Sequence, residues 1–505
     1  GGAFGGREDV SVQIVLALAA FRLGIPVKMV WTRQESMVGH HKRHPITYRA
    51  RLGATRAGKL VAAEISVLAD GGAYASTSMA VLANAMLFST GPYVIPHVSV
   101  SGQVVYTNNP PCGAMRGFGA LQGNFCAEMQ MARLAARLGL DPVALRAANL
   151  VGPGATLPNG SALPAGVVGA HETLEQAAHA AGWAWHDGDR PGPAAGAGRM
   201  ARGRGFACGW KNVGLGAGVP DLAQTVVELH GTTDIERAVV RNAAADVGQG
   251  VQTVIVQVVA EVLGLPLERI EVIGADTGQS PQTGTASASR LTVMVGNATI
   301  RAAQEALARW RAEERPAIGR GRYEAPETHP LENTPPAGQT HYSLGYTAGC
   351  AEVSVDLDTG QVRLESFVSA LDAGQAINPD QVEGQTHGSI TQAIGWTLSE
   401  KLVLEEGRLL TPDLATYLVP TTLDVPPRMQ CIIVENPDPH GPFGARGIGE
   451  LPMLTVAPAI LAAIHDATGV WLDRVPALPE DVWRALRAAR GPQTGDSNPE
   501  EEHDL

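Results

Sequence analysis

The stretch that decides the fold of this chain is GARGIGELP, at residues 444–452. Its glycines remove side chains from both sides of a single acid, Glu450, so the backbone can lie close to a bulky ligand. An apolar pattern with helical spacing follows at once, through Val456, Ile460 and Ile464. Glu450 is therefore predicted to lie where a loop enters a helix, a position at which a buried acid can do chemistry. The alternative is an ordinary acid at the start of a helix.

Similar stretches recur along the chain, and each combines glycine with amide, hydroxyl or guanidinium donors. They are GGAFGGRE at residues 1–8, RGFGALQ at 116–122, VGQGV at 247–251 and GTASASR at 284–290. Exposed backbone N–H groups together with such side chains suit a phosphate or another polar, anionic cofactor. None of these stretches is a Walker loop or a dinucleotide-binding fingerprint. The chain is therefore predicted to bind an anionic group through several separate loops.

Composition excludes several classes of protein. The chain has 505 residues, of which 45% are hydrophobic and 17% charged, as in a globular protein that is large enough for more than one domain. Its net charge of −12 argues against a nucleic-acid partner. No apolar run has the length of a membrane span. The 5 cysteines are scattered without a C-x-x-C pair, which argues against a zinc or iron–sulfur site and favours the reducing cytoplasm.

The order of local signals predicts an α+β fold. Strands at 47–53 and 60–69 turn at Gly58, a helix runs from 126 to 138, and a hairpin turns at 358–360, whereas residues 313–342 read as a polar loop. Both halves place a glycine-rich loop before a helix, so two mixed α/β lobes are expected to grip one ligand between them.

Composition shifts divide the chain into four expected parts. They are a first lobe at residues 1–152, a Gly/Pro/Ala-rich linker at 153–204, a second lobe at 205–490 and a disordered acidic tail at 491–505.

The five glycine-rich stretches, in this order, resemble the molybdenum-binding large subunit of the xanthine dehydrogenase and aldehyde oxidase family of molybdenum hydroxylases. The resemblance runs over roughly residues 1–480, and its most specific parts are GARGIGE and RGFG. It implies molybdenum held by molybdopterin or molybdopterin cytosine dinucleotide, with no protein side chain as a metal ligand. It also implies two mixed lobes of the molybdenum-hydroxylase type.

The resemblance also implies a reaction. In the family, molybdenum carries hydroxyl, oxo and sulfido ligands. A glutamate takes the proton from the hydroxyl as it attacks an electron-poor carbon, while hydride passes to the sulfido ligand. The family pattern assigns this catalytic base to Glu450.

Other family positions fall on residues that would bind the cofactor. Phe4 and Gly5 match the loop beside the apical oxo ligand, and Arg116 matches an arginine on the opposite side of the metal. The full set of implied cofactor-binding residues is Phe4, Gly5, Arg116, Gln249, Ser287, Ser289, Gln385 and Gly447. Alternatives remain for several of them. The two serines could be helix caps, Gln385 could be a helix-start residue, and Arg116 could be a surface ion-pair partner.

The substrate signals point in two directions. Glu8 matches the acid that orients purines, and Phe118 matches an aromatic that packs on the substrate ring. The arginine that accompanies this acid in xanthine-type enzymes falls near Asn84, and their second aromatic falls in residues 214–218, which contain none. Glu8 could instead be a surface acid and Phe118 a core aromatic. We therefore expect hydroxylation of an N-heterocycle, either xanthine- or purine-like or nicotinate-like, with an aldehyde oxidoreductase of the same family as the alternative.

The chain contains no iron–sulfur or flavin segment, so the resemblance implies 2Fe-2S and FAD on partner chains and a hetero-oligomer. A further cofactor-gripping segment of the family lies before the opening motif, and an N-terminally truncated or split chain is therefore expected. A non-catalytic reading, in which the chain is a truncated or structural molybdopterin-binding subunit, is the alternative from another class.

Overall fold

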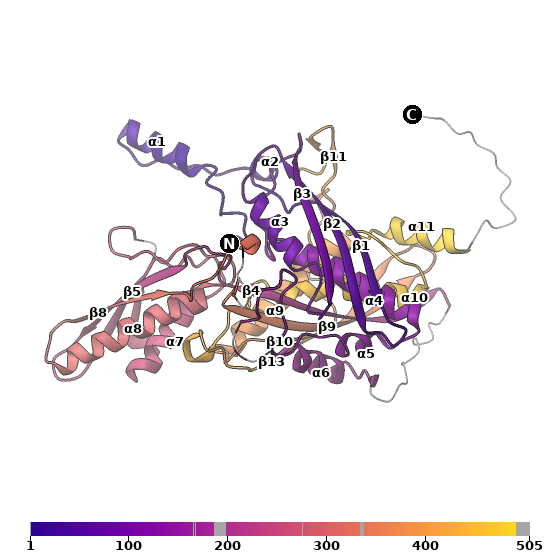
Figure 1. Ribbon diagram of the computed structural model, residues 1–505. Helices are drawn as coiled ribbons and strands as arrows, with labels where there is room; N and C mark the ends of the chain where they lie inside the picture. The colour runs from indigo at the N-terminus through magenta and orange to yellow at the C-terminus, as the bar shows by residue number, and fades with distance from the viewer. Residues whose placement is uncertain are drawn as a thin grey trace.

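The computed structural model describes residues 2–164, 166, 168–185, 198–274, 276–333 and 338–490. In this part of the chain, helices cover three larger β-sheets, and a small hairpin adds β11 (Leu404–Glu405) and β12 (Arg408–Leu409) (Figure 1). This mixture of helices and largely hairpin-joined sheets confirms the α+β expectation. The expected tail at 491–505 and part of the expected linker lie outside the described residues, so the division into lobes stays a prediction.

The first sheet has the order β1-β2-β3. Its strands are β1 (Ile46–Ala54), β2 (Leu60–Gly72) and β3 (His97–Tyr106). β1 and β2 are antiparallel, as the turn at Gly58 predicted, and β3 runs parallel to β2. Two helices pack against this sheet, α3 (Ser78–Leu87) and α4 (Ala120–Leu138).

Two short helices follow the first sheet. α5 (Pro142–Ala147) begins after Asp141, whose side chain accepts the N–H groups of Val143 and Ala144. α6 (Ala170–Ala180) lies within the range expected for the linker and packs against the central sheet.

The central sheet has the order β13-β10-β9-β4. Its strands are β4 (Met200–Val213), β9 (Ser343–Asp356), β10 (Val362–Asp372) and β13 (Arg428–Val434). α10 (Val456–Thr468), the helix predicted after Glu450, lies across β4 and β9. A Cβ atom on Gly205 would lie 2.0 Å from the carbonyl oxygen of Ala459, so glycine permits this close approach. α9 (Pro379–Leu398) also packs beside this sheet.

The third sheet has the order β7-β6-β5-β8. Its strands are β5 (Leu222–His230), β6 (Arg237–Arg241), β7 (Ile270–Ile273) and β8 (Ala317–Glu324), and its helices are α7 (Val251–Leu263) and α8 (Leu291–Arg311). The prediction of a loop over 313–342 was wrong for residues 317–324, which form β8. Its inward positions include Gly319 and Gly321, where a Cβ atom would lie 2.0 and 1.8 Å from carbonyl oxygens of α8.

The molecule has two large hydrophobic cores, and the loops of the candidate site lie between them. One core lies against the central sheet and includes Phe88, Trp210 and Ile460, and the first sheet has a smaller core of its own that includes Ile65 and Val67. The other large core lies beneath the third sheet and includes Val227 and Met294. Figure 1 shows the third sheet to one side, the other two sheets to the other side, and the N-terminus between them. Loops that meet between the two cores carry the glycine-rich motifs.

Three further helices are α1 (Gln13–Leu23), α2 (Arg33–Gly39) and α11 (Pro479–Arg490). α11 buries Val482 and Leu486 in the core of the central sheet, whereas α1 and α2 have no buried residue. α1 projects from the body, and Phe21 on it is 84% exposed (Figure 1). Among the described residues, none of the helices combines the length and hydropathy needed to span a lipid bilayer.

Candidate active site

A cavity of about 360 Å³ lies where the glycine-rich loops meet. The structure brings every residue that the sequence analysis assigned to the site to its wall: Phe4, Gly5, Glu8, Arg116, Phe118, Gln249, Ser287, Ser289, Gln385, Gly447 and Glu450. Gln385 lies in α9, the other residues come from loops, and the segments lie far apart in the chain. Their placement together is a finding, whereas the role of each one stays a prediction.

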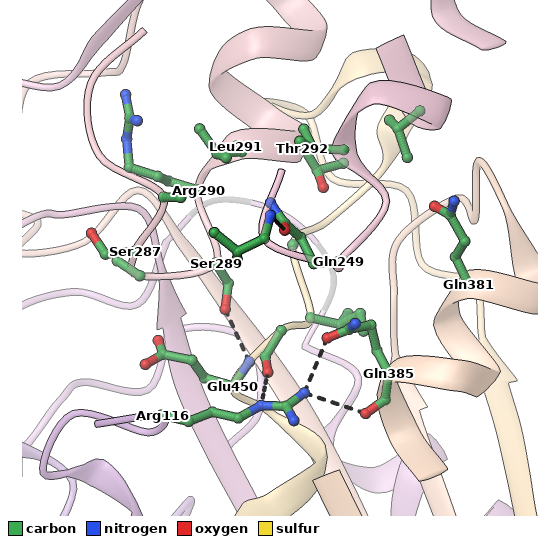
Figure 2. A pocket seen from close by; sticks show the side chains of 18 of the residues that line it. Arg116, Gln249, Ser287, Ser289, Arg290, Leu291, Thr292, Gln381, Gln385 and Glu450 are labelled. Atoms are coloured by element: carbon green, nitrogen blue, oxygen red, sulfur yellow. Dashed lines mark hydrogen bonds between the residues drawn. The ribbon is translucent and has the colours of Figure 1, made fainter. Parts of the chain in front are cut away.

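Arg116 lies in the loop before α4 and is only 7% exposed, so it is not a surface ion-pair partner. Its Nε donates to the carbonyl oxygen of Gly449 at 2.5 Å, and its Nη1 donates to Oε1 of Gln392 at 3.0 Å. Its Nη2 donates to the backbone oxygen and to Oε1 of Gln385 at 3.3 and 3.1 Å (Figure 2). Burial lowers the pKa of Arg116 to about 10, and the nearby Glu450 opposes this effect. Neutral acceptors therefore hold a guanidinium that remains charged at neutral pH.

Glu450 lies just before the short helix η5 (Pro452–Thr455), which leads into α10. Its side chain is 13% exposed, and Oε2 lies 3.3 Å from Nζ of Lys211. Oε1 accepts the backbone N–H of Gly117 at 2.9 Å. The backbone N–H of Glu450 donates to Oγ of Ser289 at 3.1 Å (Figure 2). Gly117 and Lys211 thus hold the carboxylate at the cavity wall, and Ser289 holds the backbone of the same residue.

The arginine of the GARGIGE stretch is a structural residue. Arg446 is 6% exposed and pairs with Asp372 at 2.6 Å and with Asp438 at 3.1 Å. These bonds anchor the stretch to the end of β10. At the next position, a Cβ atom on Gly447 would lie 1.7 Å from the carbonyl oxygen of Ser289. Glycine is therefore required for the 444–452 and 284–290 loops to touch.

The 284–290 loop is held from behind by Arg290. This side chain is buried, pairs with Asp221 at 2.6 Å and donates to the carbonyl oxygens of Thr283 and Thr285 at 2.8 Å. Ser289 takes a left-handed backbone conformation with φ 51°, which is rare outside glycine and is often found at functional sites. Its hydroxyl binds Glu450, and α8 begins without a side-chain cap, so Ser289 is not a helix cap.

The opening loop contacts both sides of the cavity. The backbone oxygen of Phe4 accepts the N–H of Arg116 at 2.7 Å, and the N–H of Gly2 donates to the carbonyl oxygen of Val247 at 2.8 Å. A Cβ atom on Gly5 would lie 2.5 Å from the carbonyl oxygen of Ala114, so this approach also needs glycine. Phe4 has a left-handed φ of 54°.

Two further residues predicted for the site, Phe118 and Gln249, also lie at the cavity wall. Phe118 has a left-handed φ of 45° and is half-buried at the cavity wall, so it is not a fully buried core aromatic. Gln249 uses its amide within its own turn, because Oε1 accepts from Val247 at 2.7 Å and Nε2 donates to Ala245 at 2.8 Å. The neighbouring Gly248 has nothing within 4 Å of its Cβ position, which leaves bare backbone toward the cavity.

Glu8 is not a surface acid. It lines the cavity, and burial raises its pKa to about 7, with further contributions from Glu450 and Asp9. Asp9 is held in turn by His41 at 3.0 Å. At neutral pH a large fraction of Glu8 is therefore protonated and can donate a hydrogen bond to a bound molecule. Asn84, the position of the missing arginine, does not line the cavity.

The comparisons with known proteins agree with this geometry. A family profile described as molybdopterin cofactor-binding domain matches residues 1–150, and a second profile with the same description matches residues 176–315 and 307–426. The chain is 32% identical to a probable xanthine dehydrogenase subunit of Bacillus subtilis (strain 168), over 96% of this chain and 68% of that protein. This chain belongs to the molybdenum hydroxylase family. The resemblance seen in the sequence is confirmed.

Two further matches extend over different lengths of this molybdenum hydroxylase chain. The solved aldehyde oxidoreductase from Desulfovibrio desulfuricans ATCC 27774 has a TM-score of 0.87 and 27% identity, over 96% of this chain and 54% of that one. The nicotinate dehydrogenase large molybdopterin subunit of Eubacterium barkeri is 47% identical over 177 residues, which cover 35% of this chain and 41% of that protein. The chain thus spans about half the length of the solved relative.

The residues of the cavity fit the cofactor of the family. Arg116, the hydroxyl of Ser287 and the bare backbone at Gly248 suit a polar, anionic group. Nowhere in the described parts of the chain do three or more His, Cys, Asp or Glu side chains gather in a way that could hold a metal ion.

Lys211 of the molybdenum hydroxylase site was not predicted from the sequence. This residue lies on β4, its side chain is 2% exposed, and it forms the ion pair with Glu450. A lysine between buried residues of a strand was the available signal, because a fully buried lysine is rare unless it is paired. Its partner is far away in sequence, so the pairing itself could not be foreseen.

Proposed function

We propose that this chain is the cofactor-binding and catalytic part of an enzyme that hydroxylates an electron-poor carbon of an N-heterocycle with oxygen from water. The observation that carries the proposal is the fixed carboxylate of Glu450, which lies at the cavity wall beside the buried guanidinium of Arg116. When bound, the molybdenum cofactor supplies the oxygen-transfer and two-electron chemistry. The protein supplies position, charge and proton transfer.

Each side chain has a distinct part in this proposal. Glu450 accepts the proton at a carboxylate oxygen as the new carbon–oxygen bond forms. Arg116 balances negative charge on the cofactor. The residues that shape the cofactor site are Phe4, Gly5, Gln249, Ser287, Ser289, Gln385 and Gly447. Phe118 packs on the substrate ring. Glu8 binds the substrate at a ring nitrogen or an exocyclic oxygen.

A xanthine- or purine-like or nicotinate-like substrate is supported by the protonation of Glu8. A carboxyl group with a pKa of about 7 can donate to a ring nitrogen or accept from a ring N–H, so it can match either tautomer of a heterocycle. Two relatives are named for xanthine and for nicotinate, which are both N-heterocycles. An aldehyde oxidoreductase is the second candidate, because the solved relative bears that name.

The proposal includes partner chains. Electrons would leave through 2Fe-2S and FAD groups on companion chains of a hetero-oligomer, and this arrangement is supported by relatives whose names describe them as single subunits of larger enzymes. A reducing cytoplasm suits the cysteines, all 5 of which are free thiols.

The test is oxygen labelling in the purified complex. Molybdenum is measured per chain, and xanthine, hypoxanthine, nicotinate and an aromatic aldehyde are incubated in water enriched in oxygen-18. We expect a heterocycle product that carries the label, and we expect Glu8→Ala to lower kcat/KM for heterocycles but not for aldehydes. Faster turnover of the aldehyde would favour the second candidate. A molybdenum-loaded complex that converts none of these compounds would favour the non-catalytic alternative.

A further inference from the structure

Glu450 has a cationic neighbour on the side away from the cavity. Nζ of Lys211 lies 3.3 Å from Oε2 of Glu450, and the lysine side chain is 2% exposed. Lys211 does not line the cavity, so a ligand bound there would meet the carboxylate and not the ammonium group. Lys211 therefore contacts Glu450 from the protein interior, and the carboxylate lies between the lysine and the cavity.

The surroundings of Lys211 leave Glu450 as its one close anion among the described residues. Its Nζ also donates to Oδ1 of Asn212, which is neutral, and lies 5.8 Å from the centre of the Phe88 ring. Burial, and then the positive charge of Lys211, lower the pKa of His341 to about 3, so this imidazole is neutral at neutral pH. A buried ammonium group needs a counter-charge to offset its lost hydration, and Glu450 provides it.

The two oxygens of Glu450 have different partners. Oε1 accepts the N–H of Gly117, whereas Oε2 makes no hydrogen bond among the described residues and has only the ion pair with Lys211. Removal of the ammonium group would leave Oε2 buried without compensation. The carboxylate could then rotate or take up a proton, and either change would spoil it as a proton acceptor.

We infer that Lys211 is a positioning residue that holds Glu450 in one orientation through a buried ion pair, ready to accept a proton from the reacting group. This inference rests on the proposed function of Glu450 and deepens it. Lys211 acts from behind the carboxylate and touches neither substrate nor cofactor.

Other ionisable groups act on the same pair and must be separated from Lys211 in any test of pH dependence. They are Glu8 from the opening loop, Arg43 from the segment before β1, Arg116 from the loop before α4, and His341 from the loop before β9. Arg43 and Arg116 stay charged and His341 stays neutral at neutral pH, because their pKa values lie at about 10, about 10 and about 3. Glu8 is the member of this group that titrates near neutral pH, with a pKa of about 7.

The first experiment needs neither cofactor nor turnover. The purified protein is treated with a water-soluble carbodiimide and glycine ethyl ester, which modify carboxyl groups in their protonated form, and labelling of Glu450 is followed against pH by peptide mass spectrometry. The background is Glu8→Gln, which removes the neighbouring titration. We expect Lys211→Met to extend labelling of Glu450 upward by about 1–3 pH units, the effect of losing an opposite charge at this distance. Lys211→Arg should leave the pH range near that of the parent.

The second experiment measures kcat/KM against pH in the molybdenum-loaded complex. We expect Lys211→Met to keep its molybdenum, to lose at least about tenfold in kcat/KM at pH 7, and to move the acid limb toward higher pH, with recovery in Lys211→Arg. The matched control is Lys401→Met, since Lys401 is an exposed lysine. Thermal unfolding of each variant shows whether it is folded.

The results separate the two proposals. If labelling of Glu450 has the same pH range in folded Lys211→Met and Lys211→Arg, the inference is wrong even when the parent enzyme is active. If Lys211→Met shifts the labelling but the loaded parent converts no substrate, the pair is real and the proposed function is wrong. If Lys211→Met does not fold, Lys211→Gln and Lys211→Arg decide the same comparison.

Discussion

Replacement of Glu8 by glutamine should change how the stability of the protein depends on pH. Burial raises the pKa of Glu8 from 4.5 to about 7, with Glu450 and Asp9 adding to the effect. Between these two values the unfolded chain has lost a proton that the folded chain keeps. Folding therefore becomes less favourable as pH rises through this window, and the penalty is complete above about pH 7.

The magnitude follows from the size of the shift. At about 1.4 kcal/mol per pKa unit, a rise from 4.5 to about 7 corresponds to about 3 kcal/mol as an upper limit. Glu8 is only half-buried, and solvent screening reduces this value to about 1–2 kcal/mol. Glutamine is never charged, so Glu8→Gln should remove the penalty. Its stability relative to the parent should rise by about 1–2 kcal/mol between pH 5 and pH 8.

The assay is urea unfolding of both proteins at pH 5, 6, 7 and 8, followed by the fluorescence of the 8 tryptophans. Glu175→Gln is the control, because Glu175 is an exposed acid on α6. Its difference from the parent should stay constant with pH. A difference between Glu8→Gln and the parent that stays flat, or that shrinks toward pH 8, would show that Glu8 is not desolvated in the folded state.

Two other substitutions test the framework of the site. Arg116→Lys should lower the molybdenum content of the purified complex by at least about tenfold, because lysine cannot reproduce the hydrogen bonds that the guanidinium makes in three directions. Metal analysis of the complex checks this prediction, and an unchanged molybdenum content would refute it. Glu128→Gln should lower the free energy of unfolding by about 3–5 kcal/mol, because it breaks a buried ion pair in which Nε of Arg146 lies 2.7 Å from Oε2 of Glu128. Urea unfolding checks this prediction, and a loss below about 1 kcal/mol would contradict it.

The sequence was sufficient for elements whose signals are local. α10 was predicted from the spacing of Val456, Ile460 and Ile464, and the antiparallel pair β1–β2 from the turn at Gly58. β8 was missed for a physical reason. Its inward positions include Gly319 and Gly321, which let α8 approach closely but give no apolar alternation to detect.

For the site too, features with a local sequence pattern could be predicted, whereas contacts between distant segments could not. The glycine-rich loops could be recognised because each carries its own pattern, and the structure places all of them on one cavity. The buried ion pairs of Arg446 with Asp372 and of Arg290 with Asp221 could not be predicted, because the partners lie in distant segments of the sequence. Lys211 was missed for the same reason, since only the folded chain places β4 behind the GARGIGE stretch.

The most direct measurement is the turnover of Glu450→Gln in the molybdenum-loaded complex, with Glu175→Gln as the control. Glutamine keeps the size of the side chain but cannot act as a base at neutral pH. We expect molybdenum content equal to that of the parent and a loss of at least about 100-fold in kcat for the heterocycle substrate. A fully loaded Glu450→Gln complex that turns over within a few-fold of the parent would contradict the account, because the proton would then have another acceptor.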